Sequence, residues 1–219
     1  MTIFSKLFGS SKQREIKKML TEKLKHVQEE YKPLGELGKA IIKASVNCRD
    51  AVKKLINMPS EGEKERQQRE IFIFYEFIYI YVHLTLRQAF GNLTKEQTQK
   101  LHDFLGPLIS SVAIDSCFAH WPEDLKQKMT DEFYQKLNDA ELEYTECTDR
   151  MQFDSSKDRQ DRIKDIYRAL FLKLSFNVAG LACNDENNSK LTVPVMDVAM
   201  NEWIKMRLDK LIADVKKVE

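Results

Sequence analysis

Glycine and proline are scarce in this chain, with 7 and 5 of them among 219 residues. Because folds rich in turns use both residues heavily, their scarcity argues against β-sandwich, collagen-like and low-complexity classes. Charged residues make up 32% of the chain and hydrophobic residues 42%, a mixture typical of amphipathic helices around a buried core. The composition therefore predicts a globular, helical protein.

Closely spaced cysteines are also missing. The four cysteines lie far apart and form neither a C-x-x-C pair nor a Cys/His ligand spacing; they are Cys48, Cys117, Cys147 and Cys183. This excludes a zinc knuckle and a thioredoxin-type motif. We expect reduced, partly buried thiols.

Long apolar segments are absent as well. Residues 1–9 hold only a short apolar cluster, so we expect no signal peptide. The longest apolar run, residues 71–86, contains Glu76 and His83 and is shorter than the roughly 20 residues that cross a bilayer. We therefore expect a cytoplasmic protein that is not an integral membrane protein.

Apolar residues instead recur every three or four positions, which is the spacing of helices. This spacing predicts an all-α, single-domain bundle of about seven helices, with a largely buried, aromatic-rich central helix at about residues 69–90. We expect residues 1–10 to form an amphipathic tail and residues 11–219 one helical domain. That domain would comprise a basic hairpin (11–57) and a core bundle (63–219), with expected helices at 16–31, 37–55, 63–90, 94–119, 122–151, 163–180 and from about Pro194 onward.

Local signals predict several helix ends. Thr94 and Gln97 have the spacing of a capping box, and Pro122 suits the first turn of a helix. Pro33 and Gly35 are expected to separate the two hairpin helices, and the polar run 184–189 is expected to be a loop.

The charges are balanced overall but unevenly distributed. The net charge is +1, yet residues 1–57 hold 13 basic and 6 acidic residues, and residues 103–165 hold 8 basic and 15 acidic ones. Either these are solvated faces, which could oppose each other within the fold, or they form a surface for an anionic partner. A nucleic-acid partner is disfavoured, because the basic half uses Lys rather than Arg and aromatics.

The N-terminus combines apolar and basic side chains. If residues 2–8 are helical, one face presents Ile3, Phe4, Leu7 and Phe8, flanked by Lys6, Lys12, Arg14, Lys17 and Lys18. Such a pattern suits weak, reversible contact with an anionic membrane. A tail packed on the bundle is the alternative.

Two polar residues interrupt the apolar central helix. Glu76 and His83 are two turns apart and share one face. One hypothesis is a satisfied buried network, such as Glu76 with Arg87 or His83. The alternative is a metal- or ligand-binding site at Glu76 and His83, with His102 and Asp103 as additional ligands.

The doublet His102-Asp103 resembles the His-Asp pair of HD-domain phosphohydrolases, which are also all-α. The resemblance covers fewer than ten residues, and the small residues that surround the pair in that family are missing here. It implies a metal set completed by His83 upstream and by Asp154, Asp158 or Asp165 downstream.

The sequence favours a non-enzymatic protein that acts through protein–protein contact, with weak peripheral membrane contact through its basic N-terminus. The alternative is a metal- or small-ligand-binding bundle. A third possibility is an apolar-ligand pocket lined by the rings of the central helix, namely Phe72, Phe74, Tyr75, Phe77, Tyr79 and Tyr81.

Overall fold

The computed structural model describes residues 31–55, 62–119, 121–149, 158–182 and 188–217. All regular elements in these ranges are helices: α2 (Lys32–Leu55), α3 (Glu63–Phe90), α4 (Lys95–Phe118), α5 (Glu123–Asp149), α6 (Arg159–Ala182), α7 (Asn188–Met206) and α8 (Leu208–Lys216). The all-α prediction is confirmed for this part of the chain. The expected tail (1–10), the expected helix at 16–31 and the nine residues assigned to membrane contact lie outside the described residues.

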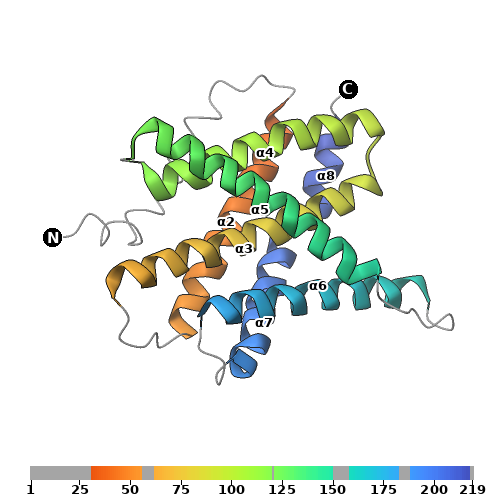
Figure 1. The fold of residues 1–219 in the computed structure, drawn as a ribbon. Helices are drawn as coiled ribbons and strands as arrows, with labels where there is room; N and C mark the ends of the chain where they lie inside the picture. The colour runs from red at the N-terminus through yellow and green to blue at the C-terminus, as the bar shows by residue number, and fades with distance from the viewer. Residues whose placement is uncertain (1–30, 56–61, 120, 150–157, 183–187, 218–219) are drawn as a thin grey trace.

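Helix α3 packs against most of the others. It contacts α2, α4, α5, α6 and α8, and Figure 1 shows α5 crossing in front of it, with α4 above and α6 below. All side chains from Phe77 to Thr85 are buried. The absence of a polar face over these two turns is explained by packing on several sides at once.

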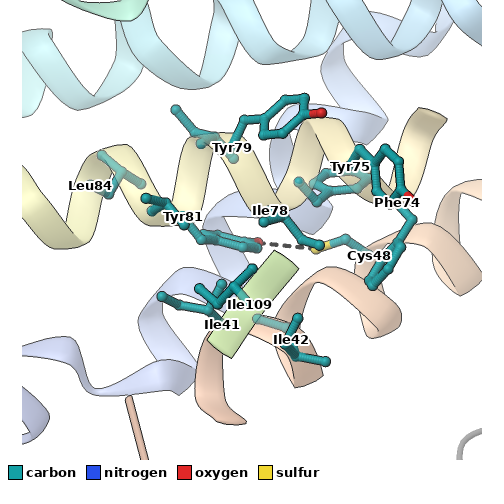
Figure 2. Close-up of a cluster of buried hydrophobic side chains, with 14 of the residues drawn as sticks. Ile41, Ile42, Cys48, Phe74, Tyr75, Ile78, Tyr79, Tyr81, Leu84 and Ile109 are labelled. Atoms are coloured by element: carbon teal, nitrogen blue, oxygen red, sulfur yellow. Dashed lines mark hydrogen bonds between the residues drawn. The ribbon is translucent and has the colours of Figure 1, made fainter. Parts of the chain in front are cut away.

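The core is formed where α2 faces α3 (Figure 2). Ile41 and Ile42 of α2 point toward α3, and Ile109 of α4 lies beside them. Tyr81 donates a 2.9 Å hydrogen bond to the carbonyl of Ala199 in α7, and its hydroxyl lies 3.0 Å from Sγ of Cys48. These contacts satisfy the polar atom of a fully buried ring, which would otherwise be costly to bury.

The cysteines in the described residues are free thiols: Cys48, Cys117 and Cys147. Burial raises the pKa of the Cys48 thiol to about 12. Cys48 therefore behaves as a small core residue that stays protonated at neutral pH.

The local signals for helix ends give mixed results. The capping box is confirmed, because Oγ1 of Thr94 accepts from the amide of Gln97 and Oε1 of Gln97 accepts from the amide of Thr94, both at 3.2 Å. The second hairpin helix was expected to begin after Pro33 and Gly35, but α2 begins at Lys32 and includes both residues. The helix expected before it lies outside the described residues. Proline is tolerated in the first turn because its missing N–H has no partner there.

The C-terminal helices also differ from expectation. Helix α7 begins six residues before Pro194, because Leu191, Val195 and Ala199 bury one continuous face that outweighs the single donor lost at the proline. The helix then ends at Met206, where Arg207 adopts the left-handed conformation with φ 49° and ψ 49°. The backbone of a residue other than glycine is strained in that region, because its Cβ approaches the following carbonyl oxygen.

We predict that Arg207→Gly raises the free energy of unfolding by about 0.5 kcal/mol, because glycine adopts a positive φ without strain. The matched control is Arg207→Ala, which also removes the 3.5 Å ion pair with Asp209 but keeps a Cβ. Urea denaturation of the three proteins measures the effect. If the glycine variant is no more stable than the alanine variant, backbone strain at this position is absent.

Candidate functional site

The polar residues of α3 form contacts with α5 and α6. Nδ1 of His83 lies 2.9 Å from Oε2 of Glu141 in α5, and the imidazole is 4% exposed. Since a carboxylate can only accept hydrogen bonds, Nδ1 carries the proton in this pair. The contact holds Glu141 in one orientation against α3.

Three polar atoms around this pair are buried without a hydrogen-bond partner. They are Nε2 of His83, Oε1 of Glu141 and the hydroxyl of Tyr144, whose ring centroid lies 5.4 Å from that of His83. A buried polar atom without a partner costs about 1–3 kcal/mol. The cluster is therefore only partly satisfied, and such clusters occur at sites with a role beyond packing.

Glu141 also lines a cavity of about 270 Å³ between α3, α4 and α5, which we call the α3–α4–α5 pocket. Its walls are partly apolar and partly polar, with the polar residues contributed by α4 and α5. The lining consists of Val82, Leu86, His102, Asp103, Leu105, Gly106, Pro107, Tyr134, Leu137, Asn138 and Glu141. A Cβ at Gly106 would lie 3.4 Å from Cε1 of Tyr134, so the tyrosine ring lies close to α4 at this position.

The structure places His102 and Asp103 at the exposed rim of this pocket. Their side chains are 67% and 63% exposed, with 3.6 Å between Nδ1 of His102 and Oδ1 of Asp103. Asp103 also accepts a 2.8 Å hydrogen bond from Gln99. The doublet is thus near Glu141, the partner of His83, and lines the same cavity.

Glu76 has a different environment. Its Oε2 accepts a 3.2 Å hydrogen bond from Nδ2 of Asn177 in α6, and the same amide nitrogen lies 3.3 Å from Glu143 of α5. Burial raises the pKa of Glu76, and the nearby Glu143 carboxylate adds to this, although the hydrogen bond from Asn177 opposes it. Glu76 and Glu143 both line a second hollow, of about 430 Å³, between α3 and α5.

The expected direct pairing of Glu76 with His83 or Arg87 is not what the structure shows. Seven residues span about 10 Å along a helix axis, which is too far for a hydrogen bond between Glu76 and His83. Arg87 instead donates to Oγ1 of Thr148 at 3.2 Å. Glu76, His83 and Arg87 therefore each reach a neighbouring helix rather than one another.

We predict that Glu76→Gln raises the free energy of unfolding at pH 7 by about 1 kcal/mol, because it removes a buried charge and keeps an acceptor for Asn177. The folded-state pKa of Glu76 is raised, so the wild type loses stability as pH rises from about 4.5 through that pKa. The glutamine variant should lack this loss. Urea unfolding from pH 4 to 8 measures both effects.

The matched control for this prediction is Glu143→Gln. Its carboxylate also contacts Asn177, but the side chain is 43% exposed and pairs with Lys173, so the variant should gain no stability. If Glu76→Gln is less stable than the wild type at every pH, burial of the charge is not costly here.

A metal site is not assembled from these residues. In the described ranges there is no group of three or more His, Cys, Asp or Glu placed to hold an ion. Glu76, His83 and the doublet have separate partners, and Asp154, one of the residues implied by the HD-domain resemblance, lies outside the described part of the chain. Of the six rings of α3 named above, five are buried in the core and Phe72 is 41% exposed. Only Tyr79 among them lines either of the two hollows described here.

Sequence reasoning missed several residues of the site. Asn177 could have been noticed as an amide inside the apolar stripe of α6, between Leu174 and Val178. Tyr134 and Asn138 carry no comparable signal, because their proximity to α4 depends on how the helices pack. Glu141 is one of nine acidic residues in α5, and only the structure selects it.

The charged helices α2 and α5 share the neighbours α3 and α4 but are not packed extensively on each other. Helix α5 holds nine acidic and three basic residues, and α2 holds six basic and two acidic ones. Helix α2 packs on α3, α4, α7 and α8, whereas α5 packs on α3, α4 and α6. Their charges are therefore not neutralised by packing of one helix on the other.

Comparison with protein-family models, curated proteins and solved structures finds no match to this chain. Among the described helices, none combines the length and the apolar character needed to cross a membrane. The site's own chemistry is accordingly the basis for a functional proposal.

Proposed function

We propose that this protein is a non-enzymatic binding protein whose acidic α5 surface contacts a partner protein through a segment rich in Lys and Arg. The observation that supports this proposal is the excess of acid on α5, with nine acidic and three basic residues, on a helix that is not packed extensively on the basic helix α2. Opposite charges across an interface speed association and select partners.

The exposed side of α5 has features that suit such a partner. Asp131, Glu132 and Asp139 are exposed on it, and Leu142 is 66% exposed among them. Hollows that contain carboxylates lie on both sides of the helix. A basic segment could place cations against the carboxylates and an apolar side chain against Leu142, which is the usual combination of polar rim and apolar anchor.

The test compares two double variants, each of which replaces two charged side chains by neutral ones of similar size. Glu132→Gln with Asp139→Asn removes acid from α5, and Lys43→Gln with Lys54→Gln removes base from α2. Proteins captured from the native host by the wild type are purified, and their Kd is measured at several salt concentrations. We expect binding by the wild type and the α2 variant, and about tenfold weaker, less salt-dependent binding by the α5 variant. Equal binding by the α5 variant, or loss only in the α2 variant, would refute the proposal.

Weak membrane contact through the basic N-terminus stays part of the proposal, supported by the apolar and basic pattern of residues 3–18. Co-sedimentation with phosphatidylcholine vesicles, with and without phosphatidylserine, tests it. Deletion of residues 1–9 should abolish the sedimentation that depends on phosphatidylserine. Unchanged sedimentation of the shortened protein would exclude this contact.

The second candidate function, binding of a small ligand, is favoured by one observation. Glu141, whose carboxylate lies 2.9 Å from Nδ1 of the buried His83, lines the α3–α4–α5 pocket.

A further inference from the structure

We propose that the α3–α4–α5 pocket is the docking site for the N-terminal segment of this same chain, residues 3–8, whose apolar side chains occupy the cavity. The basic residues that flank this segment lie against the carboxylates at the edge of the pocket. The same apolar side chains are those assigned to membrane contact, so the pocket and an anionic membrane compete for them. Only this competition rests on the proposed function; docking in the pocket does not.

The described chain begins close to this pocket. Tyr31, the first residue that the structure describes, stacks on Phe104 of α4, with 5.5 Å between the ring centroids and 11° between the ring planes. The sequence neighbours of Phe104, Asp103 and Leu105, both line the cavity. The residues that precede Tyr31 therefore join the described structure within one helical turn of the pocket lining.

The length of chain before Tyr31 is sufficient to reach the cavity. An α-helix with its side chains is about 10 Å across, so a path halfway around α4 is about 16 Å, or roughly five extended residues at about 3.3 Å each. Twenty-two residues separate Phe8 from Tyr31. Because the segment is tethered to its docking site, its effective concentration there is high, and a weak contact suffices for occupancy.

The cavity suits an apolar side chain. Six of its eleven lining residues carry apolar or aromatic side chains, among them Leu86, Leu137 and Tyr134. An engineered apolar cavity of roughly 150 Å³ binds benzene, so a cavity of about 270 Å³ has room for the ring of Phe4 or Phe8. Removal of such a ring from water favours docking.

The charges of the segment and of the pocket are complementary. Residues 1–18 contain five Lys or Arg and one Glu, whereas the pocket lining contains Asp103 and Glu141 and neither Lys nor Arg. Asp131 is exposed one turn before Tyr134, on the side of α5 that lines the pocket. Attraction between these opposite charges selects the basic N-terminus as the occupant.

Photo-crosslinking of the purified full-length protein tests the docking. A diazirine-bearing phenylalanine replaces Phe4 or Phe8 in separate proteins, and mass spectrometry locates the crosslinks. Mixing unlabelled and ¹⁵N-labelled chains separates crosslinks within one chain from those between two. We expect crosslinks within one chain at Pro107 of α4 and at residues 134–141 of α5. Crosslinks that lie mainly outside the pocket lining, or only between two copies, would overturn the proposal.

Matched variants test the cavity and the charge separately. Asn138→Trp fills the pocket from an exposed position and should lower the crosslink yield severalfold, whereas Asn138→Ser should not. Asp103→Lys, at a side chain that is 63% exposed, should also lower the yield severalfold. Asp161→Lys makes the same change on α6 at 52% exposure and should leave the yield unchanged. If Asn138→Trp has no effect, or Asp161→Lys lowers the yield as much as Asp103→Lys does, the segment does not dock in this pocket.

Vesicles separate this inference from the proposed membrane contact. Phosphatidylserine vesicles should lower the crosslink yield severalfold, and phosphatidylcholine vesicles should leave it unchanged. Pocket crosslinks in a protein that does not sediment with phosphatidylserine refute the membrane contact but support the docking. Sedimentation without pocket crosslinks refutes the docking, and sedimentation with an unchanged yield refutes the competition.

Discussion

Replacing Phe74 with alanine is expected to lower the free energy of unfolding by about 3–5 kcal/mol, the usual cost of deleting a large buried ring. The Phe74 side chain is 1% exposed, and Figure 2 shows it among the side chains shared by α2 and α3. The guanidinium carbon of Arg49 lies 5.7 Å from the ring centroid, so the variant also loses a cation–π contact.

Phe90→Ala is the matched control for this substitution. The same ring is removed from the same helix, but Phe90 is 77% exposed, so the change should cost less than about 0.5 kcal/mol. Urea denaturation at equilibrium compares the two variants. Similar losses at both positions would contradict the assignment of Phe74 to the core.

The second large effect is expected at the ion pair that joins α2 to α3. Glu70 has a side chain that is 2% exposed, and Nζ of Lys53 lies 2.8 Å from its carboxylate. Removing one partner of a buried pair leaves an uncompensated charge. Lys53→Met should therefore cost about 2 kcal/mol. This is less than for a fully buried pair, because the Lys53 side chain is 41% exposed and Arg66 still lies 4.0 Å from the Glu70 carboxylate.

Two further proteins test whether the uncompensated charge is the cause. Lys54→Met makes the same change at the next position, which is also exposed but forms no ion pair with Glu70, and it should have little effect. Adding Glu70→Gln to Lys53→Met removes the isolated charge and should restore much of the lost stability. If the double variant is less stable than Lys53→Met alone, the two side chains do not interact in the way described.

The parts of the fold that depend on local sequence could be predicted. The apolar run 71–86 predicts the buried part of α3, Gly91 marks its end, and the hydroxyl of Thr94 marks the start of α4. In each case the signal lies within a few residues of the feature. The left-handed Arg207 has no such signal, because glycine or asparagine is the usual residue there.

The candidate site was only partly predictable for the same reason. The polar positions Glu76 and His83 were evident from their apolar surroundings, but their partners lie 101 and 58 residues away along the chain. The packing of α3 against α5 and α6 selects Asn177 and Glu141. Periodicity identifies the buried face of each helix but not which residue of the next helix it meets.

The central claim, that the acidic surface of α5 binds a basic partner, is tested most directly by photo-crosslinking in the native host. A benzophenone amino acid replaces Leu142 on α5 in one protein and Leu55 on α2 in the other; both leucines are exposed. We predict an adduct of defined mass from position 142 that is lost when Glu132→Gln and Asp139→Asn are added, and no such adduct from position 55. An adduct from position 55 alone, or one from position 142 that survives the loss of both charges, would contradict the claim.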